Sequence, residues 1–155
     1  MSYVIDRANL NDVDVLLKLY LIVYGSNYPL KFGTDREVMK KTIQSSDFLW
    51  LVARDPLNGN AVASVLFDID LIGKIGKIAG LVVSPEHRKQ KLASRLISSG
   101  TAELLRENGP LNSIYATTRT NSVSPQMIFL NDDFVPLGIF PNAHKLKHYE
   151  TLTLF

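Results

Sequence analysis

The chemistry of this chain is concentrated in one segment, Leu81 to Leu96, where an apolar run leads into a turn rich in basic residues. Pro85 ends a predicted strand, and a helix is predicted to begin near Lys91. The first amides of a helix lack partners within it and point at one spot, where the helix dipole favours an anion. Arg88, Lys89 and Lys91 surround this turn with cationic side chains. The segment predicts a site for a pyrophosphate group, and an ordinary turn with solvated basic residues is the alternative.

Few other residues offer reactive chemistry. The sequence of 155 residues contains no cysteine, which excludes cysteine nucleophiles, thiolate metal sites and disulfides. His144 and His148 stand four residues apart, as two metal ligands on a helix would. However, Pro141-Asn142 and the neighbouring lysines indicate a loop, and no carboxylate pattern accompanies the two histidines. We therefore expect no metal.

The charge balance argues against two classes of partner. The chain has 17 basic and 15 acidic residues, a net charge of +2, and no basic block, so neither nucleic acid nor a membrane is expected as a partner. No apolar run approaches the roughly 18 residues that span a bilayer. Met1 to Leu10 lack the pattern of a signal peptide. A cytoplasmic location is the resulting expectation.

The elements that must position the basic segment follow from the hydrophobic pattern. Continuous apolar runs suit strands covered on both faces, and apolar residues at helical spacing suit helices. Strands are predicted at Tyr3–Arg7, Phe48–Arg54, Ala61–Asp70, Lys77–Val83, Ser113–Thr118, Val135–Phe140 and Glu150–Phe155. Helices are predicted at Asn11–Tyr24, Thr34–Ser45, Lys91–Asn108 and Pro125–Asp132. The order β-α-α-β-β-β-α-β-α-β-β predicts an α/β fold, here an α+β mixed sheet, in a single domain over residues 1–155 with a right-handed crossover after Val83.

Two of the predicted helices carry capping signals. Asn11 is predicted to cap the first helix, with Asp12 and Asp14 in the first turn. Thr34 and Glu37 have the spacing of a capping box, in which each side chain bonds the amide of the other residue. These caps place two helices between the first and second strands.

The basic segment resembles the loop of the GNAT superfamily of N-acyltransferases. The family pattern is a strand, then V-x-P-x-x-R, Arg or Gln, two residues, Gly, one residue, Gly or Ala, and a helix. Val83, Pro85, Arg88 and Ala93 match this pattern in register, and the order of elements agrees along nearly the whole chain. Arg7-Ala8 is similar to the family's opening strand. The resemblance implies the GNAT acyl-CoA N-acyltransferase fold and transfer of an acyl group from acetyl-CoA to a primary amine of a small molecule or a peptide.

The resemblance also implies which residues bind the co-substrate. In the family, amides of the loop hold the CoA diphosphate, and main-chain groups of the preceding strand bind the pantetheine arm and the acyl carbonyl. The stretch Thr120–Gln126, with Phe129 and Asp133-Phe134, looks like the family's fourth helix and its end. The expected contacts with acetyl-CoA are Leu81, Val82, Val83, Arg88, Lys89, Gln90, Lys91, Leu92, Ala93, Ser94, Asn121 and Phe129. Because the family commonly dimerises, a homodimer is a further expectation.

Three positions depart from the family pattern. Lys91 replaces the loop glycine, which would let the backbone approach a phosphate closely, and Asp133 replaces the glycine before Phe134. Phe129 occupies the best match to the tyrosine that many family members use as general acid, and it has no proton to give. The alternatives are therefore a CoA-binding module with little or no catalytic activity, and a transferase that uses a longer acyl donor.

The sequence signals for the acceptor-binding site are weaker than those for the acetyl-CoA site. Tyr24 and Tyr28 lie at the end of the first predicted helix, where the family usually forms its acceptor pocket. They are the catalytic candidates, although core packing would also explain them. Asp68 and Asp70 alternate on a strand end and either line the acceptor side or face solvent. The family's last hairpin often borders this site, and the expected acceptor contacts are Tyr28, Asn142 and His144.

Overall fold

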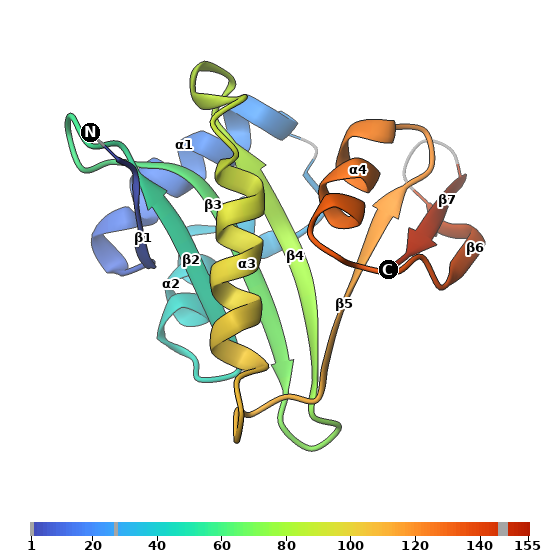
Figure 1. Cartoon of the computed structure of the whole chain (residues 1–155). Helices are drawn as coiled ribbons and strands as arrows, with labels where there is room; N and C mark the ends of the chain where they lie inside the picture. Colours follow the sequence, from blue (N-terminus) through green and yellow to red (C-terminus); the bar gives the residue numbers. More distant parts are fainter. Residues whose placement is uncertain (1, 27, 146–148) are drawn as a thin grey trace.

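The computed structural model describes residues 2–26, 28–145 and 149–155 (Figure 1). Within these residues, seven strands form one mixed sheet in the order β1-β2-β3-β4-β5-β7-β6. The strands are β1 (Val4–Arg7), β2 (Phe48–Arg54), β3 (Ala61–Asp70), β4 (Ile75–Val83), β5 (Ser113–Arg119), β6 (Gly138–Lys145) and β7 (Tyr149–Leu154). The helices are α1 (Val13–Tyr24), α2 (Arg36–Gln44), α3 (Leu92–Leu104) and α4 (Val123–Asn131). This architecture confirms the predicted α/β fold with a mixed sheet.

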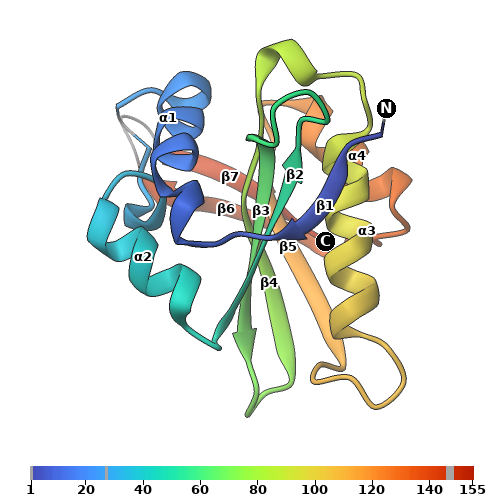
Figure 2. The same cartoon turned by 90° about the vertical axis from the view of Figure 1, so that its left-hand side faces the viewer.

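Helices cover both faces of the sheet (Figure 2). On one face α1 and α2 pack over a core that includes Leu16 and Tyr20. On the other face α3 and α4 pack over a second core, which includes Leu96 and Phe129. The interior strand β2 is covered on both sides, so that Leu49–Ala53 are all buried. This burial explains why the strand appears in the sequence as a continuous apolar run.

Strands β4 and β5 run side by side for only part of their length. They pair in parallel from Ile75 with Ser113 to Ile78 with Ala116. Beyond these pairs β5 continues to Arg119 against β7, whereas β4 continues to the turn that precedes α3. The two strands diverge toward the start of α3 (Figure 1), and in the described part of the chain no ladder pair joins them there.

A bulge in β4 lies at this diverging end. The register of β3 against β4 shifts between Ser64 and Leu66, and β4 has one residue more than its partner there. Gly80, at the bulge, has a left-handed φ of 59°, a conformation that glycine adopts readily. A Cβ atom at Gly80 would lie 2.7 Å from both Phe32 Cε2 and Tyr20 Oη. The position therefore requires glycine for both its conformation and its space.

Two predicted helix caps are displaced by a residue or more. The side chain of Asn9, rather than Asn11, caps a 3₁₀ turn that leads into α1. Asp35, rather than Thr34, caps α2, and its carboxylate accepts the amides two and three residues later at 2.9 and 3.0 Å. Glu37 forms an ion pair within the helix instead of reaching back to the cap. A carboxylate is a stronger acceptor than a hydroxyl, which explains why the aspartate takes the capping position.

The last hairpin is longer than predicted. β6 continues to Lys145, so Asn142 and the backbone of His144 lie in a strand and not in a loop. Pro141 is tolerated because β6 is the outer strand, and the register of β6 against β7 is irregular around this proline. The side chain of His144 and the whole of His148 lie outside the described residues.

Candidate active site

The turn between β4 and α3 presents unpaired backbone amides. It comprises the 3₁₀ turn Pro85–His87, Arg88 in an extended conformation, and Lys89 and Lys91 with φ values of 64° and 56°. α3 begins at Leu92, and the amides of its first turn have no acceptor within the helix. Among the described residues, no side-chain hydrogen bond from the N-cap satisfies them. Left-handed residues in such a turn make successive amides converge, so residues 88–94, here called the anion loop, have the backbone geometry of an anion site.

Lys91 shows why glycine is the family's residue at this point. Its φ of 56° and ψ of 23° are left-handed, which costs a residue with a Cβ atom roughly 1 kcal/mol or more. The residue is exposed, as are Arg88 and Lys89. The lysine thus adopts the conformation that the glycine would have, and the anion loop carries three solvent-accessible positive charges.

Hydrogen bonds connect the anion loop and its flanking residues to Tyr3, the residue before β1. The Tyr3 hydroxyl and His87 Nδ1 lie 2.9 Å apart in a hydrogen bond, and the two rings meet edge to face. Arg95, in the first turns of α3, donates from Nη2 to the Tyr3 carbonyl at 2.8 Å. Residues on both sides of the loop are therefore held by one residue near the start of the chain. Sequence reasoning missed this contact, because no local pattern links positions so far apart.

Three tyrosines lie against the diverging end of β4. Tyr20 is fully buried, and its hydroxyl donates to the Gly80 carbonyl at 2.5 Å. Tyr24, one turn further along α1, donates to the Leu81 carbonyl. The Tyr28 ring stacks on that of Tyr24 with centroids 4.6 Å apart. This tyrosine cluster, Tyr20, Tyr24 and Tyr28, supports the bulge of β4 from the side of α1.

Burial controls the protonation of the cluster. Partial burial raises the pKa of Tyr24, which is 43% exposed, against the opposing effect of the positive charges of Arg119 and Arg88. Burial and the neighbouring Tyr24 raise the pKa of Tyr28, again against Arg119. Both phenols are therefore protonated at neutral pH and available as hydrogen-bond donors rather than as bases. Arg119 ends β5 and Arg88 belongs to the anion loop, so the two charges come from opposite sides of the region where β4 and β5 diverge, here called the opening.

The predicted co-substrate residues do not all gather at one place. Residues 81–83 and 88–94 form a nearly continuous border from β4 to α3. Asn121 lies in the exposed turn between β5 and α4, across the opening from β4. Phe129 is 4% exposed, and its ring packs on those of Phe134 and Phe155. Core packing therefore accounts for the aromatic side chain at Phe129 without a ligand.

The residues predicted to contact the acceptor also lie at different places in the fold. Tyr28 lies at the opening, but Asn142 lies on β6, which β5 and β7 separate from β4. Asp68 pairs with Lys77 and Asp70 lies beside the β3–β4 turn, at the end of β4 away from the anion loop. Asp70 Oδ1 accepts two amides of that turn, each at 2.9 Å. Asp68 and Asp70 are exposed at this hairpin end of β3, away from the anion loop, which agrees with the alternative that they face solvent.

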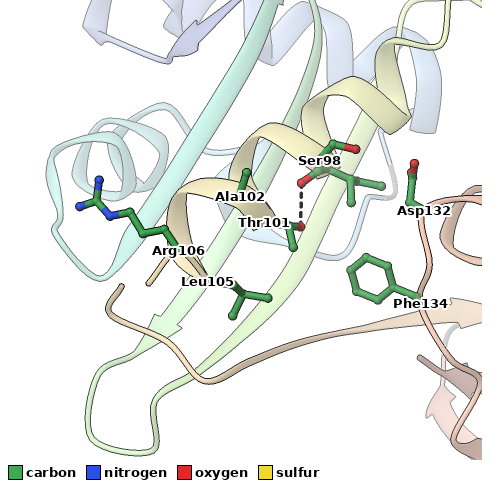
Figure 3. Close-up of a pocket in the computed structure, with 8 residues that line it drawn as sticks. Ser98, Thr101, Ala102, Leu105, Arg106, Asp132 and Phe134 are labelled. Atoms are coloured by element: carbon green, nitrogen blue, oxygen red, sulfur yellow. Dashed lines mark hydrogen bonds between the residues drawn. The ribbon is translucent and has the colours of Figure 1, made fainter. Parts of the chain in front are cut away.

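Two surface hollows lie away from the opening. One, of about 380 Å³, lies between α3 and the segment after α4, with Ile97, Leu105 and Asp132 in its lining (Figure 3). The Thr101 hydroxyl in that lining is bonded to the Ile97 carbonyl at 2.7 Å. The other, of about 470 Å³, lies beside β2 and includes Trp50. Neither is lined by the anion loop or the tyrosine cluster. We place the candidate site where β4 and β5 diverge, because the anion loop follows β4 there and the tyrosine cluster contacts the same end of β4.

Two further kinds of feature are absent from residues 2–26, 28–145 and 149–155. No helix there is long and apolar enough to cross a membrane. No group of three or more histidine, aspartate or glutamate side chains there has the arrangement of a metal site.

Comparisons with known proteins bear on the same region. The sequence model of the acetyltransferase (GNAT) family matches residues 15–126, which include the anion loop and the tyrosine cluster. No curated protein matches the sequence.

Solved structures match nearly the whole chain. A point variant of the spermidine N-acetyltransferase SpeG from Vibrio cholerae superposes with a TM-score of 0.82 at 15% identity, over 99% of this chain and 91% of that chain. The same enzyme with manganese ions gives a TM-score of 0.77 at 15% identity, over 99% and 90%. The ribosomal-protein-S18-alanine N-acetyltransferase from Escherichia coli gives 0.79 at 14% identity, over 98% and 90%. At these identities the likeness shows a shared fold.

Proposed function

Because the chain belongs to the acetyltransferase (GNAT) family, we propose that it transfers the acetyl group of acetyl-CoA to a primary amine of a small molecule or a peptide. The observation that supports this proposal most strongly is the structure at the start of α3. Its first amides lack a side-chain cap, left-handed Lys89 and Lys91 precede them, and Arg88 adds a further exposed positive charge. This arrangement fits the diphosphate of CoA, the anion that the family binds.

The edge of β4 supports the same assignment. Beyond Ile78 this edge has no partner strand in the described residues, so the main chain of residues 81–83 borders the opening. Acetyl-CoA supplies an activated thioester, and much of the rate of such a transfer can come from positioning alone. The Tyr24 hydroxyl, held at the Leu81 carbonyl, stands at the part of β4 where the family binds the acyl group.

We assign Tyr24 the role of proton donor to the leaving sulfur. Its hydroxyl is protonated at neutral pH, and two guanidinium groups oppose the effect of burial there, compared with one at Tyr28. Those charges favour the ionised form of Tyr24, which makes its proton easier to give. Tyr28 supports the ring of Tyr24 by stacking. Phe129, at the usual position of the acid, has no proton and lies in the core.

The second candidate function is a CoA-binding module with little catalytic activity. Lys91 and Phe129, both departures from the family pattern, favour it. Both candidates require that acetyl-CoA bind, but only the transferase releases free CoA thiol when an amine is added.

Thiol release in the presence of a panel of primary amines tests the proposal. The panel includes spermidine and a peptide with N-terminal alanine, the acceptors named for the two structural neighbours, together with free amino acids. The proposal predicts release that depends on both protein and amine and that is lost in Arg88→Glu. Binding of acetyl-CoA without thiol release for any amine would instead support the binding module.

A further inference from the structure

Arg119 is the charged residue at the end of β5, on the far side of the opening from β4. It pairs with Leu152 of β7 in the ladder. Two strand neighbours on β5, Ala116 and Thr118, are buried, and Ala116 belongs to the core beneath α3 and α4. Because side chains alternate between the faces of a strand, Arg119 projects toward the opposite face. That face carries α1 and the tyrosine cluster.

An ion pair holds the guanidinium of Arg119 from the side of β7. Its Nε lies 3.1 Å from Glu150 Oε2. Glu150 belongs to β7, which lies on the side of β5 away from β4. The side chain of Glu150 is 18% exposed and that of Arg119 47% exposed. Within the described residues, Nη1 and Nη2 of Arg119 make no hydrogen bond, so they are free to bind a ligand in the opening.

Two guanidinium groups bring positive charge to the opening. The charge of Arg119 acts on the hydroxyls of both Tyr24 and Tyr28, and Arg88 acts on Tyr24. Among the described residues, only phenols and guanidinium groups act on these two hydroxyls by charge. The strand-end aspartates of β3 lie at the other end of the sheet. Glu150, which pairs with Arg119 from the side of β7, is the carboxylate nearest to this guanidinium in the described residues. No carboxylate among the described residues acts by charge on the Tyr24 or Tyr28 hydroxyl.

This charge selects among amines. A second ammonium group on the acceptor would be repelled, whereas a carboxylate would form a charge-assisted, bidentate hydrogen bond with the Nη atoms of Arg119. Positive charge nearby also lowers the pKa of an ammonium group and so favours the neutral, nucleophilic amine. The same charges thus reduce the need for the carboxylate base that β4 lacks.

We infer that the acceptor is a primary amine that carries a carboxylate, and that Arg119 binds this carboxylate at the mouth of the opening. The inference rests on the proposed function and specifies its substrate class. It sets this chain apart from a polyamine acetyltransferase, although it shares that fold. The carboxylate belongs either to a free amino acid or to an acidic residue beside a peptide amine, and both sources offer the same chemistry to Arg119.

Matched amines test the inference. The ω-amino acids glycine, β-alanine and 4-aminobutyrate are compared with the diamines of two, three and four carbons, by kcat/KM for thiol release. We expect the best amino acid to exceed the diamine of equal length by about tenfold or more. The dipeptide amides Gly-Asp and Gly-Asn show whether the carboxylate belongs to a free amino acid or to a peptide. Preference for Gly-Asp, with free amino acids inert, indicates a peptide acceptor.

Three variants assign the preference to one residue. Arg119→Gln should abolish it, with acetyl-CoA affinity unchanged. Glu150→Gln removes the counter-charge, should keep or enlarge the preference, and serves if Arg119→Gln fails to fold. Arg36→Gln is the matched control, since Arg36 is also about half exposed and paired with a carboxylate, Asp14, but lies at the start of α2. It should leave the preference unchanged.

A binding measurement separates failure of the inference from failure of the proposed function. Calorimetry with 4-aminobutyrate and n-butylamine, on protein saturated with CoA, reports acceptor binding without turnover. Binding of 4-aminobutyrate that depends on Arg119, without acetylation of any amine, would uphold the inference about the site and refute transfer. Equal use or equal binding of carboxylate-bearing and carboxylate-free amines, or a preference that survives Arg119→Gln, would overturn the inference.

Discussion

Gly80 allows the structure of the bulge to be tested quantitatively through Gly80→Ala. The φ of 59° would cost alanine roughly 1 kcal/mol or more. The new Cβ atom would also lie 2.7 Å from Phe32 Cε2 and Cζ and from Tyr20 Oη. Overpacking of this kind costs about 1–3 kcal/mol, and loss of the Tyr20 hydrogen bond to the Gly80 carbonyl costs about 1 kcal/mol more. The free energy of unfolding should fall by roughly 3–5 kcal/mol, or roughly 6–20 °C in Tm at this chain length.

Gly59→Ala is the matched control. Gly59 also has a positive φ, of 75°, but a Cβ atom there would meet nothing within 4 Å. Its cost should therefore be the conformational one alone, about 1 kcal/mol. Urea unfolding and thermal unfolding of both variants provide the comparison. Equal losses of stability would refute the close packing of Gly80 against Phe32 and Tyr20.

Three further predictions concern the candidate site. Arg88→Glu should weaken acetyl-CoA binding by about tenfold or more, with Tm unchanged, because it reverses a charge beside the diphosphate; a calorimetric affinity equal to wild type would place the phosphate elsewhere. Lys91→Gly should preserve or tighten acetyl-CoA binding, because a glycine lets the backbone approach a phosphate more closely; weaker binding would make the lysine charge a phosphate ligand. Tyr24→Phe should lower kcat for thiol release roughly a hundredfold with acetyl-CoA affinity unchanged, as expected for loss of a general acid. An unchanged kcat would exclude Tyr24 from the chemistry.

Sequence reasoning succeeded where local physics decides the structure. Residues 48–54 and 61–70 were predicted as strands with the observed bounds, because burial on both faces imposes an apolar run. The turn between β4 and α3 was predicted because its signals, a strand, Pro85 and a helix start, all lie within one short segment. Binding of an anion at this turn stays a prediction. The parallel pairing of β4 and β5 through α3 followed from the order of elements.

Sequence reasoning failed where residues distant in the sequence, or neighbouring elements, decide the local structure. Pro141 suggested a loop, but only the sheet order shows that its strand is an edge, where proline is tolerated. Asp70 appeared available for an acceptor until its carboxylate was seen to bond the adjacent turn. The contact of Tyr3 with His87 and the place of Arg119 opposite the tyrosine cluster depend on the folded sheet, and no local pattern encodes them.

Binding of acetyl-CoA is the most direct test of the central claim that the opening and the anion loop form an acetyl-CoA site. Thermal unfolding of the wild-type protein across a titration of acetyl-CoA measures it, with Arg88→Glu as comparison. A ligand concentration of 100 times Kd stabilises a protein by about 2.7 kcal/mol, which corresponds to roughly 5–10 °C for a chain of this length. The account predicts a saturable rise of this size for the wild type and a much smaller one for Arg88→Glu. No rise at millimolar acetyl-CoA would contradict it.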